Sequence, residues 1–347
     1  MNKLVKELLQ NLNEPKFRLK QIEEAYYIKS IIDVEDIMVL PKSLREKIKN
    51  NGGLISFKLK NKQESKDGTI KCLFELSDKN VVESVLMRYT SKSGKLRNTI
   101  CISSQAGCAM RCSFCATGTM GLKRNLSADE IADQVVYFNN IIFKKTHDSK
   151  DKIDNVVFMG MGEPLNNYVN VLGAVQIINE KIGIGSRHIT ISTCGIIPNI
   201  LKLAEEPYQV NLAISLHSPY DDQRSNIMPI NRSYKIAELL DAVKIYLEKT
   251  NRRVSLEYIM LGGQNDSIET AEDLGHLLEP LRLVHVNCIP YNPTLSEDGS
   301  IKYAQSSNNQ IHRFAQKLED CGVSATIRQN KGRDIDGACG QLAAKLN

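Results

Sequence analysis

The sequence predicts an α/β protein in which a partial (β/α)6 barrel follows an N-terminal domain of helices and antiparallel strands. Two patterns predict this fold. Strand-like and helix-like segments alternate six times after residue 98, whereas the residues before them show helical periodicity and then short apolar runs between turns. Alternating βα units require a parallel sheet covered by helices, and six units favour a shortened or open barrel over a closed one of eight. A doubly wound sheet is the alternative, because its periodicity is the same.

Residues 1–95 form the predicted N-terminal domain. Leucine spacing and proline breaks predict helices within 4–12, 17–28 and 41–51, and apolar runs at 54–59, 69–76 and 81–89 predict an antiparallel meander. Residues 1–100 carry 20 Lys and Arg against 13 Asp and Glu, whereas the rest of the chain is slightly acidic. A basic segment of this kind is typical of a surface that binds RNA or DNA, although solvated lysines are the commoner cause.

The barrel is predicted over residues 96–330, after a polar stretch at 91–98. The expected strands are 99–103, 155–160, 188–193, 209–215, 254–261 and 284–290, each followed by a helical pattern. Ser127 and Glu130 form a capping box that starts one helix, and Ser233 is expected to start another. A helix at 307–321 and a strand at 323–328 lead into a polar C-terminal tail, 331–347.

The composition restricts the chemistry. A chain of 347 residues with 42% hydrophobic residues builds its core without disulfides, so its nine cysteines need another explanation. No signal peptide is expected, because Lys3, Lys6 and Glu7 interrupt the apolar stretch that one would need. No run of 18 apolar residues occurs either. The sequence therefore predicts a cytoplasmic protein without membrane segments. Cysteines stay reduced in that compartment, and clustered ones indicate metal or redox chemistry.

Cys108, Cys112 and Cys115 come shortly after the first predicted barrel strand. Ligands of α/β barrels and open sheets bind at the carboxyl ends of the strands. Three thiolates at this spacing can hold three corners of a [4Fe-4S] cluster and leave one iron open to a ligand. The alternatives are a zinc site, which usually needs a fourth protein ligand, and incidental buried cysteines.

Further motifs surround these cysteines. They read CISSQAGC at 101–108, GLKRNL at 121–126, MGMGEP at 159–164, SLH at 215–217 and DGACGQL at 336–342. Together they resemble the RlmN/Cfr family of radical S-adenosylmethionine (SAM) RNA adenine methyltransferases. The resemblance extends from Arg18 to the C-terminal tail, and several independent motifs in the same order make it specific.

The resemblance implies two cofactors and the residues that bind them. Cys108, Cys112 and Cys115 would hold a [4Fe-4S] cluster, whose open iron binds SAM. The residues that would bind SAM follow the ends of barrel strands: Gly162, Glu163, Ser192, Ser215, Leu216, His217 and Asn292. Taken singly, a residue such as Ser192 or Asn292 is more typical of a turn or a cap.

The resemblance also implies a radical mechanism that uses two SAM molecules per turnover. Cys339 would take a methyl group from one SAM, and a radical made from the second would remove a hydrogen from that group, so that its carbon adds to adenine. Glu83 would accept the ring proton, although a glutamate between valines is otherwise typical of a solvated strand face. Cys101 would then attack the sulfur of Cys339, which releases the methylated RNA and leaves a disulfide. The remaining cysteines are interpreted as small core residues: Cys72, Cys194, Cys288 and Cys321.

The expected substrate is an adenosine of 23S rRNA at the peptidyl-transferase centre, methylated on carbon 2, with the tRNA adenosine next to the anticodon as a further target. Cfr-type methylation of carbon 8, which confers antibiotic resistance, is the alternative. Pro164 and Ala106 favour carbon 2, whereas segments 13–15 and 40–42 favour carbon 8. An external electron donor such as a flavodoxin or ferredoxin is also implied, and the chain is expected to be a monomer. The rival classes are a non-catalytic iron–sulfur or zinc RNA-binding protein and a radical SAM enzyme for a small molecule.

Overall fold

A computed structural model describes residues 1–90, 94, 96–148, 150–294 and 300–343. Its main feature, among these residues, is one sheet of eleven strands in the order β1-β2-β3-β4-β7-β8-β9-β10-β11-β13, with β12 paired to β10. The strands are β1 (Phe57–Glu64), β2 (Ile70–Leu76), β3 (Val81–Thr90), β4 (Leu96–Cys101), β7 (Asn155–Phe158), β8 (Ile189–Thr193), β9 (Asn211–Ser215), β10 (Val254–Gly262), β11 (Val284–Pro290), β12 (Ala304–Gln305) and β13 (Ala325–Ile327). A separate hairpin consists of β5 (Gln105–Gly107) and β6 (Leu122–Asn125).

The strands from β4 to β13 along the main sheet pair in parallel. All six predicted barrel strands are present, with ends that differ from the predicted ones by at most three residues. Their apolar side chains are buried, as in Ile189 and Ile191 of β8 and Val286 of β11. The prediction of a partial α/β barrel is therefore confirmed, and the sheet stays open between β1 and β13.

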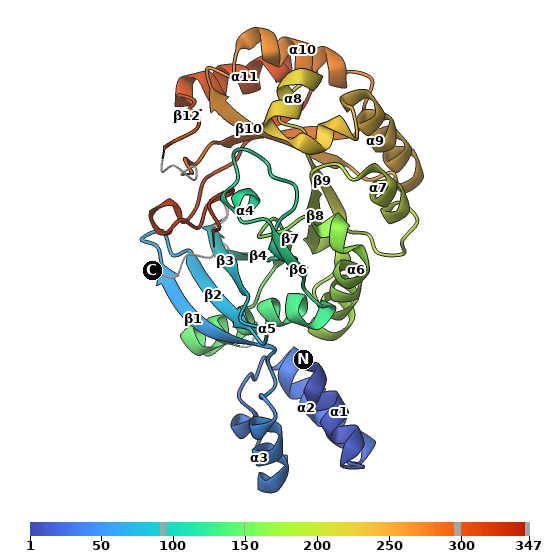
Figure 1. Cartoon of the computed structure of the whole chain (residues 1–347), viewed down its shortest axis with the longest axis vertical. Coiled ribbons are helices and arrows are strands. Elements are labelled where there is room, and N and C mark those ends of the chain that lie inside the picture. Colours follow the sequence, from blue (N-terminus) through green and yellow to red (C-terminus); the bar gives the residue numbers. More distant parts are fainter. Residues whose placement is uncertain (91–93, 95, 149, 295–299, 344–347) are drawn as a thin grey trace.

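Helices cover the outer side of the curved sheet, and α1 to α3 extend away from it (Figure 1). The α-helices are α1 (Lys3–Asn11), α2 (Lys16–Glu23), α3 (Lys42–Asn50), α4 (Ala116–Thr119), α5 (Ala128–Thr146), α6 (Tyr168–Gln176), α7 (Ile197–Leu203), α8 (Asp221–Ile227), α9 (Ile236–Thr250), α10 (Ile268–Leu278) and α11 (Asn308–Asp320). Short 3-10 or π segments are Glu24–Ile28, Val34–Asp36, Pro164–Asn167, Ile177–Ile182, Ser186–His188, Pro229–Arg232 and Arg333–Ile335.

Helix α5 begins as predicted. The Ser127 hydroxyl accepts the Glu130 N–H at 3.2 Å, and the Glu130 carboxylate accepts the Ser127 N–H at 2.8 Å, which completes the capping box. The predicted start of α9 at Ser233 is wrong. Ser233 ends the 3-10 turn Pro229–Arg232, and the N-cap of α9 is Lys235.

The N-terminal meander is continuous with the barrel sheet. Strands β3 and β4 pair antiparallel over six residues, with Val85 opposite Cys101. The first strand begins at Phe57 rather than at residue 54, because the backbone before it bonds elsewhere: the Leu54 carbonyl oxygen accepts the Asn2 N–H at 2.7 Å, and the Ser56 N–H donates to the Asp133 carboxylate at 2.9 Å. The division at residue 95, which lies outside the described residues, stays a prediction.

One cluster of buried side chains extends from the N-terminal helices through the barrel to Leu342. Among the described residues, no helix combines the length and the apolar character that crossing a bilayer requires.

Candidate active site

The three clustered cysteines lie on the loop of the β5–β6 hairpin. Two glycines determine the path of this loop. Gly107 has a φ of +75°, and a Cβ there would lie 1.9 Å from the carbonyl oxygen of Gly121. A Cβ at Gly118 would lie 2.9 Å from the carbonyl oxygen of Cys112. Glycine is therefore required at both positions, because the backbone folds back on itself there.

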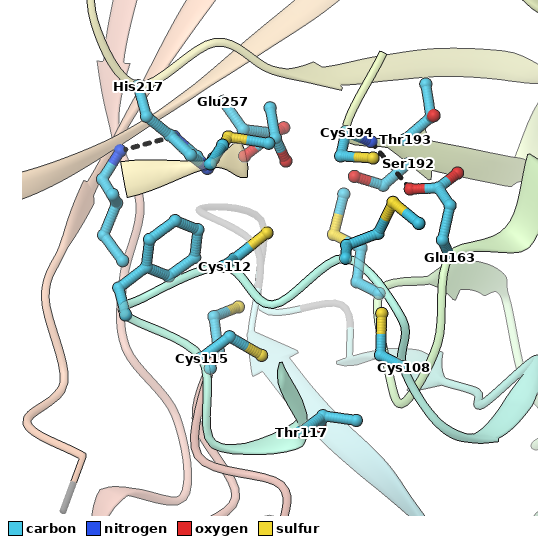
Figure 2. A pocket seen from close by; sticks show the side chains of 18 of the residues that line it. Cys108, Cys112, Cys115, Thr117, Glu163, Ser192, Thr193, Cys194, His217 and Glu257 are labelled. Carbon is cyan, nitrogen blue, oxygen red and sulfur yellow. Dashed lines mark hydrogen bonds between the residues drawn. The ribbon is translucent and has the colours of Figure 1, made fainter. Parts of the chain in front are cut away.

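A cavity of about 150 Å³ separates this loop from the ends of β7, β8 and β9. Figure 2 shows the three loop thiols facing residues of those strand ends. The predicted site residues that line the cavity are Cys108, Cys112, Cys115, Gly162, Glu163, Ser192, Ser215, His217 and Cys339. Folding thus gathers residues from five separate segments of the sequence around one space.

The thiols suit a metal cluster. Burial raises the pKa of Cys108 to about 12, and burial also raises the pKa of Cys112 and Cys115. Thiols in such surroundings ionise only beside a positive centre, which a metal provides. Among the described residues, no three His, Cys, Asp or Glu side chains are placed to hold a single metal ion. In a [4Fe-4S] cluster each thiolate binds a different iron, and three buried thiols around one cavity are a donor set that fits such a cluster.

Glu163 connects the ends of β7 and β8. Its carboxylate accepts the N–H of Leu165 at 3.0 Å and the N–H of Cys194 at 2.8 Å, and burial raises the pKa of Glu163. The neighbouring Gly162 has a φ of +102°, and a Cβ there would lie 2.5 Å from the side chain of Gln105. Only glycine fits between this strand end and the hairpin.

Arg224, which sequence reasoning missed, holds the next two strand ends. Its guanidinium donates to the carbonyl oxygens of Cys194 at 2.9 Å, Ser215 at 2.9 Å and Leu216 at 3.0 Å. It also donates to the side chain of Asn231 at 2.8 Å and is fully buried. Arg224 therefore fixes the backbone that carries the SLH motif. No pattern around it in the sequence indicates this role.

His217 presents a neutral ring to the cavity. Its Nδ1 accepts the N–H of Ile259 at 3.1 Å, and its ring meets Phe114 edge to face with 4.9 Å between centroids. Burial, and then the charge of Arg224, lowers the pKa of His217 to about 3. The imidazole therefore carries no charge at neutral pH.

Cys339 borders a second cavity, of about 50 Å³, which Cys101 and Arg328 also line. Burial, and then the nearby Cys339, raises the pKa of Cys101 to about 12. Cys339 is also the main reason why the pKa of Arg328 is raised. All nine cysteines lie within the described residues and are free thiols. Cys101 and Cys339 thus share a cavity without being joined.

The C-terminal segment that carries Cys339 is attached to the thiol loop. The N–H of Ala116 donates to the carbonyl oxygen of Gly340 at 2.8 Å, and the Thr117 hydroxyl donates to the carbonyl oxygen of Leu342 at 2.6 Å. These bonds place Cys339 between the two cavities. The predicted tail residues 344–347 lie outside the described residues.

Besides Cys101, which lines only the second cavity, three predicted residues are absent from the described lining of the thiol cavity. Leu216 is fully buried, and its N–H donates to the carbonyl oxygen of Glu257 at 3.0 Å. Asn292 accepts a hydrogen bond from the Asn330 side chain at 2.9 Å. Glu83 on β3 is 2% exposed, so the interpretation of its position as a solvated strand face is wrong.

The structure also adds residues to the cavity wall that sequence reasoning missed. Cys194 is buried, as expected of a core residue, but it lines the thiol cavity. Its position directly after the third barrel strand was a usable signal. Glu257 and Arg328 also line the cavity, with 3.5 Å between the carboxylate and the guanidinium. Cys72 and Cys288 are buried as predicted, whereas Cys321 is only half-buried.

Comparison with known proteins assigns the family. The model of the radical SAM superfamily matches residues 102–274. Proteins from Bacillus thuringiensis (strain Al Hakam) and Bacillus anthracis (strain A0248) are 45% identical over 339 residues, which cover 97% of this chain and 90% of theirs. Both are named "Probable dual-specificity RNA methyltransferase RlmN". The chain belongs to the RlmN family.

A solved structure agrees with this assignment. The crystal structure of a radical SAM methyltransferase from Sphaerobacter thermophilus matches with a TM-score of 0.89 and 42% identity, over 98% of this chain and 97% of that one. Membership of the RlmN family confirms the prediction of a radical SAM RNA methyltransferase and the choice of the RlmN type over the Cfr type. It implies a [4Fe-4S] cluster and SAM as cofactors. It also overrules the two rival classes, a non-catalytic RNA-binding protein and a small-molecule enzyme.

Proposed function

We propose that this chain methylates carbon 2 of an adenosine of 23S rRNA at the peptidyl-transferase centre, and the tRNA adenosine next to the anticodon. One observation carries the proposal: Cys339 borders both the cavity of the three clustered thiols and the cavity of Cys101. An enzyme that moved a methyl group directly from SAM to RNA would need no thiol at this junction. Relatives named as dual-specificity RNA methyltransferases support the two RNA substrates.

In this proposal the cluster is held by Cys108, Cys112 and Cys115. SAM is bound by the residues at the strand ends and beyond them: Gly162, Glu163, Ser192, Ser215, Leu216, His217 and Asn292. When bound, the cluster and two SAM molecules per turnover supply the methyl group and the radical that makes this group reactive. The electron comes from an external donor such as a flavodoxin or ferredoxin, and the chain acts as a monomer.

The protein residues act in sequence on the transferred carbon. The Cys339 thiolate accepts the methyl group and becomes a thioether. Once this carbon is bonded to the adenine ring, Glu83 accepts the proton that leaves carbon 2. The Cys101 thiolate then attacks the sulfur of Cys339, so that a disulfide forms and the carbon–sulfur bond breaks. The electron pair of that bond stays on the carbon, which takes up a proton to become the methyl group of the released RNA. The external donor reduces the disulfide.

The basic N-terminal domain is the proposed RNA-binding surface, because residues 1–100 carry 20 Lys and Arg against 13 Asp and Glu. Cationic side chains contact the phosphate backbone, and a target base that is splayed from its stack becomes accessible to the cavity. Ribosomal RNA as a substrate makes the cytoplasm the proposed place of action.

The test is mass spectrometry of nucleosides. Anaerobically reconstituted protein is incubated with 23S rRNA, tRNA, a reductant and methyl-labelled SAM, and the digested RNA is separated into 2-methyl- and 8-methyladenosine. We expect label only in 2-methyladenosine. Label only in 8-methyladenosine would contradict the choice of carbon 2, and unlabelled RNA with both substrates would overturn the proposed function.

A further inference from the structure

Strand pairing places a lysine beside the proposed proton acceptor. In the register of β2 and β3, Glu83 lies opposite Leu73, and Lys71 lies opposite Val85. Residues two positions apart on a strand share a face, so Lys71 and Glu83 are diagonal neighbours on one face. Diagonal neighbours are within reach of each other when one side chain is long.

The two side chains form a buried ion pair. The Nζ of Lys71 lies 3.1 Å from Oε1 of Glu83, with 10% of the lysine side chain and 3% of the glutamate side chain exposed. A buried charge that loses its partner is strongly destabilising, so the two side chains hold each other in place.

The C-terminal segment closes the other side of this pair. The second carboxylate oxygen of Glu83, Oε2, accepts the N–H of Ala343 at 2.9 Å, and Lys71 donates to the carbonyl oxygen of Asp336 at 3.4 Å. Both side chains line a polar cavity of about 210 Å³ together with Asp336 and Gln341. The segment that carries Cys339 is thus attached at both of its ends to the Lys71–Glu83 pair.

We propose that Lys71 is a positioning residue that holds the Glu83 carboxylate in the orientation for proton transfer, and that it links the approach of the Cys339 segment to removal of the ring proton. This inference rests on the proposed function of Glu83. Lys71 touches neither RNA nor SAM in this account and acts only through the carboxylate. The proton moves from carbon 2 of the adenine to a carboxylate oxygen of Glu83.

The decisive variant is Lys71→Met, which removes the ammonium and keeps the apolar stem. The full chain with reconstituted cluster is given SAM and RNA whose target adenosine carries either hydrogen or deuterium at carbon 2. We expect the methyl group still to appear on Cys339, as a mass increase on the corresponding peptide, at a rate within twofold of the unaltered protein. Methylated RNA should fall at least tenfold, and deuterium should slow its formation more in Lys71→Met than in the unaltered protein. A purely structural role of Lys71 would not create this isotope effect.

Two further variants complete the design. Lys71→Arg retains the positive charge beside Glu83 and should recover product formation to within about threefold of the unaltered protein. Lys317→Met removes the same charge outside the basic N-terminal domain, together with an ion pair of 2.8 Å with Glu272, and should leave every readout unchanged. In a Glu83→Gln background, Lys71→Met should add little further loss, because its effect passes through the carboxylate.

The outcomes separate this inference from the proposed function. Absence of 2-methyladenosine with the unaltered protein overturns the function itself. Equal product and equal isotope effects in Lys71→Met and the unaltered protein overturn the role of Lys71 alone. Loss of Cys339 methylation in Lys71→Met also overturns it, because the lysine would then support the whole fold rather than the proton transfer.

Discussion

The thiol of Cys101, at the end of β4, and the thiol of Cys339, in the C-terminal segment, border the same small cavity. Single substitutions can separate the proposed roles of these two residues. Cys339→Ala should acquire no methyl group and transfer none. Cys101→Ala should still accept the methyl group on Cys339, but should accumulate a covalent adduct with RNA, because no thiol remains to displace the product.

Gel electrophoresis under denaturing conditions checks this contrast, since the adduct migrates as protein joined to RNA. Cys321→Ala, a change at a half-buried cysteine outside both cavities, is the control and should behave as the unaltered protein. An adduct with Cys339→Ala, or free methylated RNA at the normal rate with Cys101→Ala, would contradict the assigned roles.

Gly107→Ala should disrupt the thiol loop. The new Cβ would lie 1.9 Å from the Gly121 carbonyl oxygen, at a φ of +75°, so the loop must shift. We expect iron bound after reconstitution to fall at least fivefold and the free energy of unfolding of the cluster-free chain to fall by more than about 2 kcal/mol. Gly121→Ala is the matched control, because its φ of +64° is also unfavourable but no atom lies within 4 Å of its Cβ. It should cost about 1 kcal/mol and retain most of the iron.

Arg224→Met should weaken SAM binding even though Arg224 acts only through the backbone that it holds. The change leaves the carbonyl oxygens of Cys194, Ser215 and Leu216 without their buried donor. We expect at least a tenfold weaker affinity for SAM and a loss of about 3 kcal/mol in the free energy of unfolding. Calorimetric titration of the reconstituted chain and urea denaturation measure the two effects. The exposed Arg187, changed to Met, should alter stability by less than about 0.5 kcal/mol, and a similar result for Arg224 would refute its role.

Alkaline pH should destabilise the cluster-free chain through buried thiols such as Cys72. Burial raises the pKa of Cys72 from 9.0 to about 12, so the thiol ionises above pH 9 only in the unfolded chain. The unfolded state then binds fewer protons than the folded state, and stability falls as pH rises from 9 towards 12. Urea denaturation at pH 8 and pH 10 should show a loss that is about 1 kcal/mol smaller for Cys72→Ala than for the unaltered chain. Between pH 6 and pH 8 the two slopes should agree, and a difference there would point to another cause.

Much of the fold follows from local patterns in the sequence. Parallel strands such as β8, in which the buried Ile189 and Ile191 alternate with polar residues, show the period of a strand, so their positions were predictable to within a few residues. The edge strand β1 was harder to place, because the apolar run at 54–59 ends before most of the strand, whose exposed residues include Lys58 and Lys60. The start of α9 was misplaced because a 3-10 turn, which depends on contacts elsewhere, precedes it.

The residues of the candidate site also divide into those that a local sequence pattern reveals and those that depend on distant partners. The spacing of Cys108, Cys112 and Cys115 is a local property, and it pointed to the cavity directly. The burial of Glu83 is not local, because it depends on Lys71 from another strand and on Ala343 from the far end of the chain. Arg224 escaped for the same reason, since its partners become neighbours only after folding.

The antiparallel pairing of β3 with β4 fixes a distance within the molecule. Because backbone hydrogen bonds, rather than a hinge, join the meander to the barrel, the distance between the meander surface and the clustered thiols is set when the sheet forms. An RNA bound to the meander would bring its target base into the thiol cavity only if the base projected from the RNA by one fixed distance. The protein would then select substrates by how far the target base projects from the folded RNA. Two RNAs of unrelated sequence could both meet this condition.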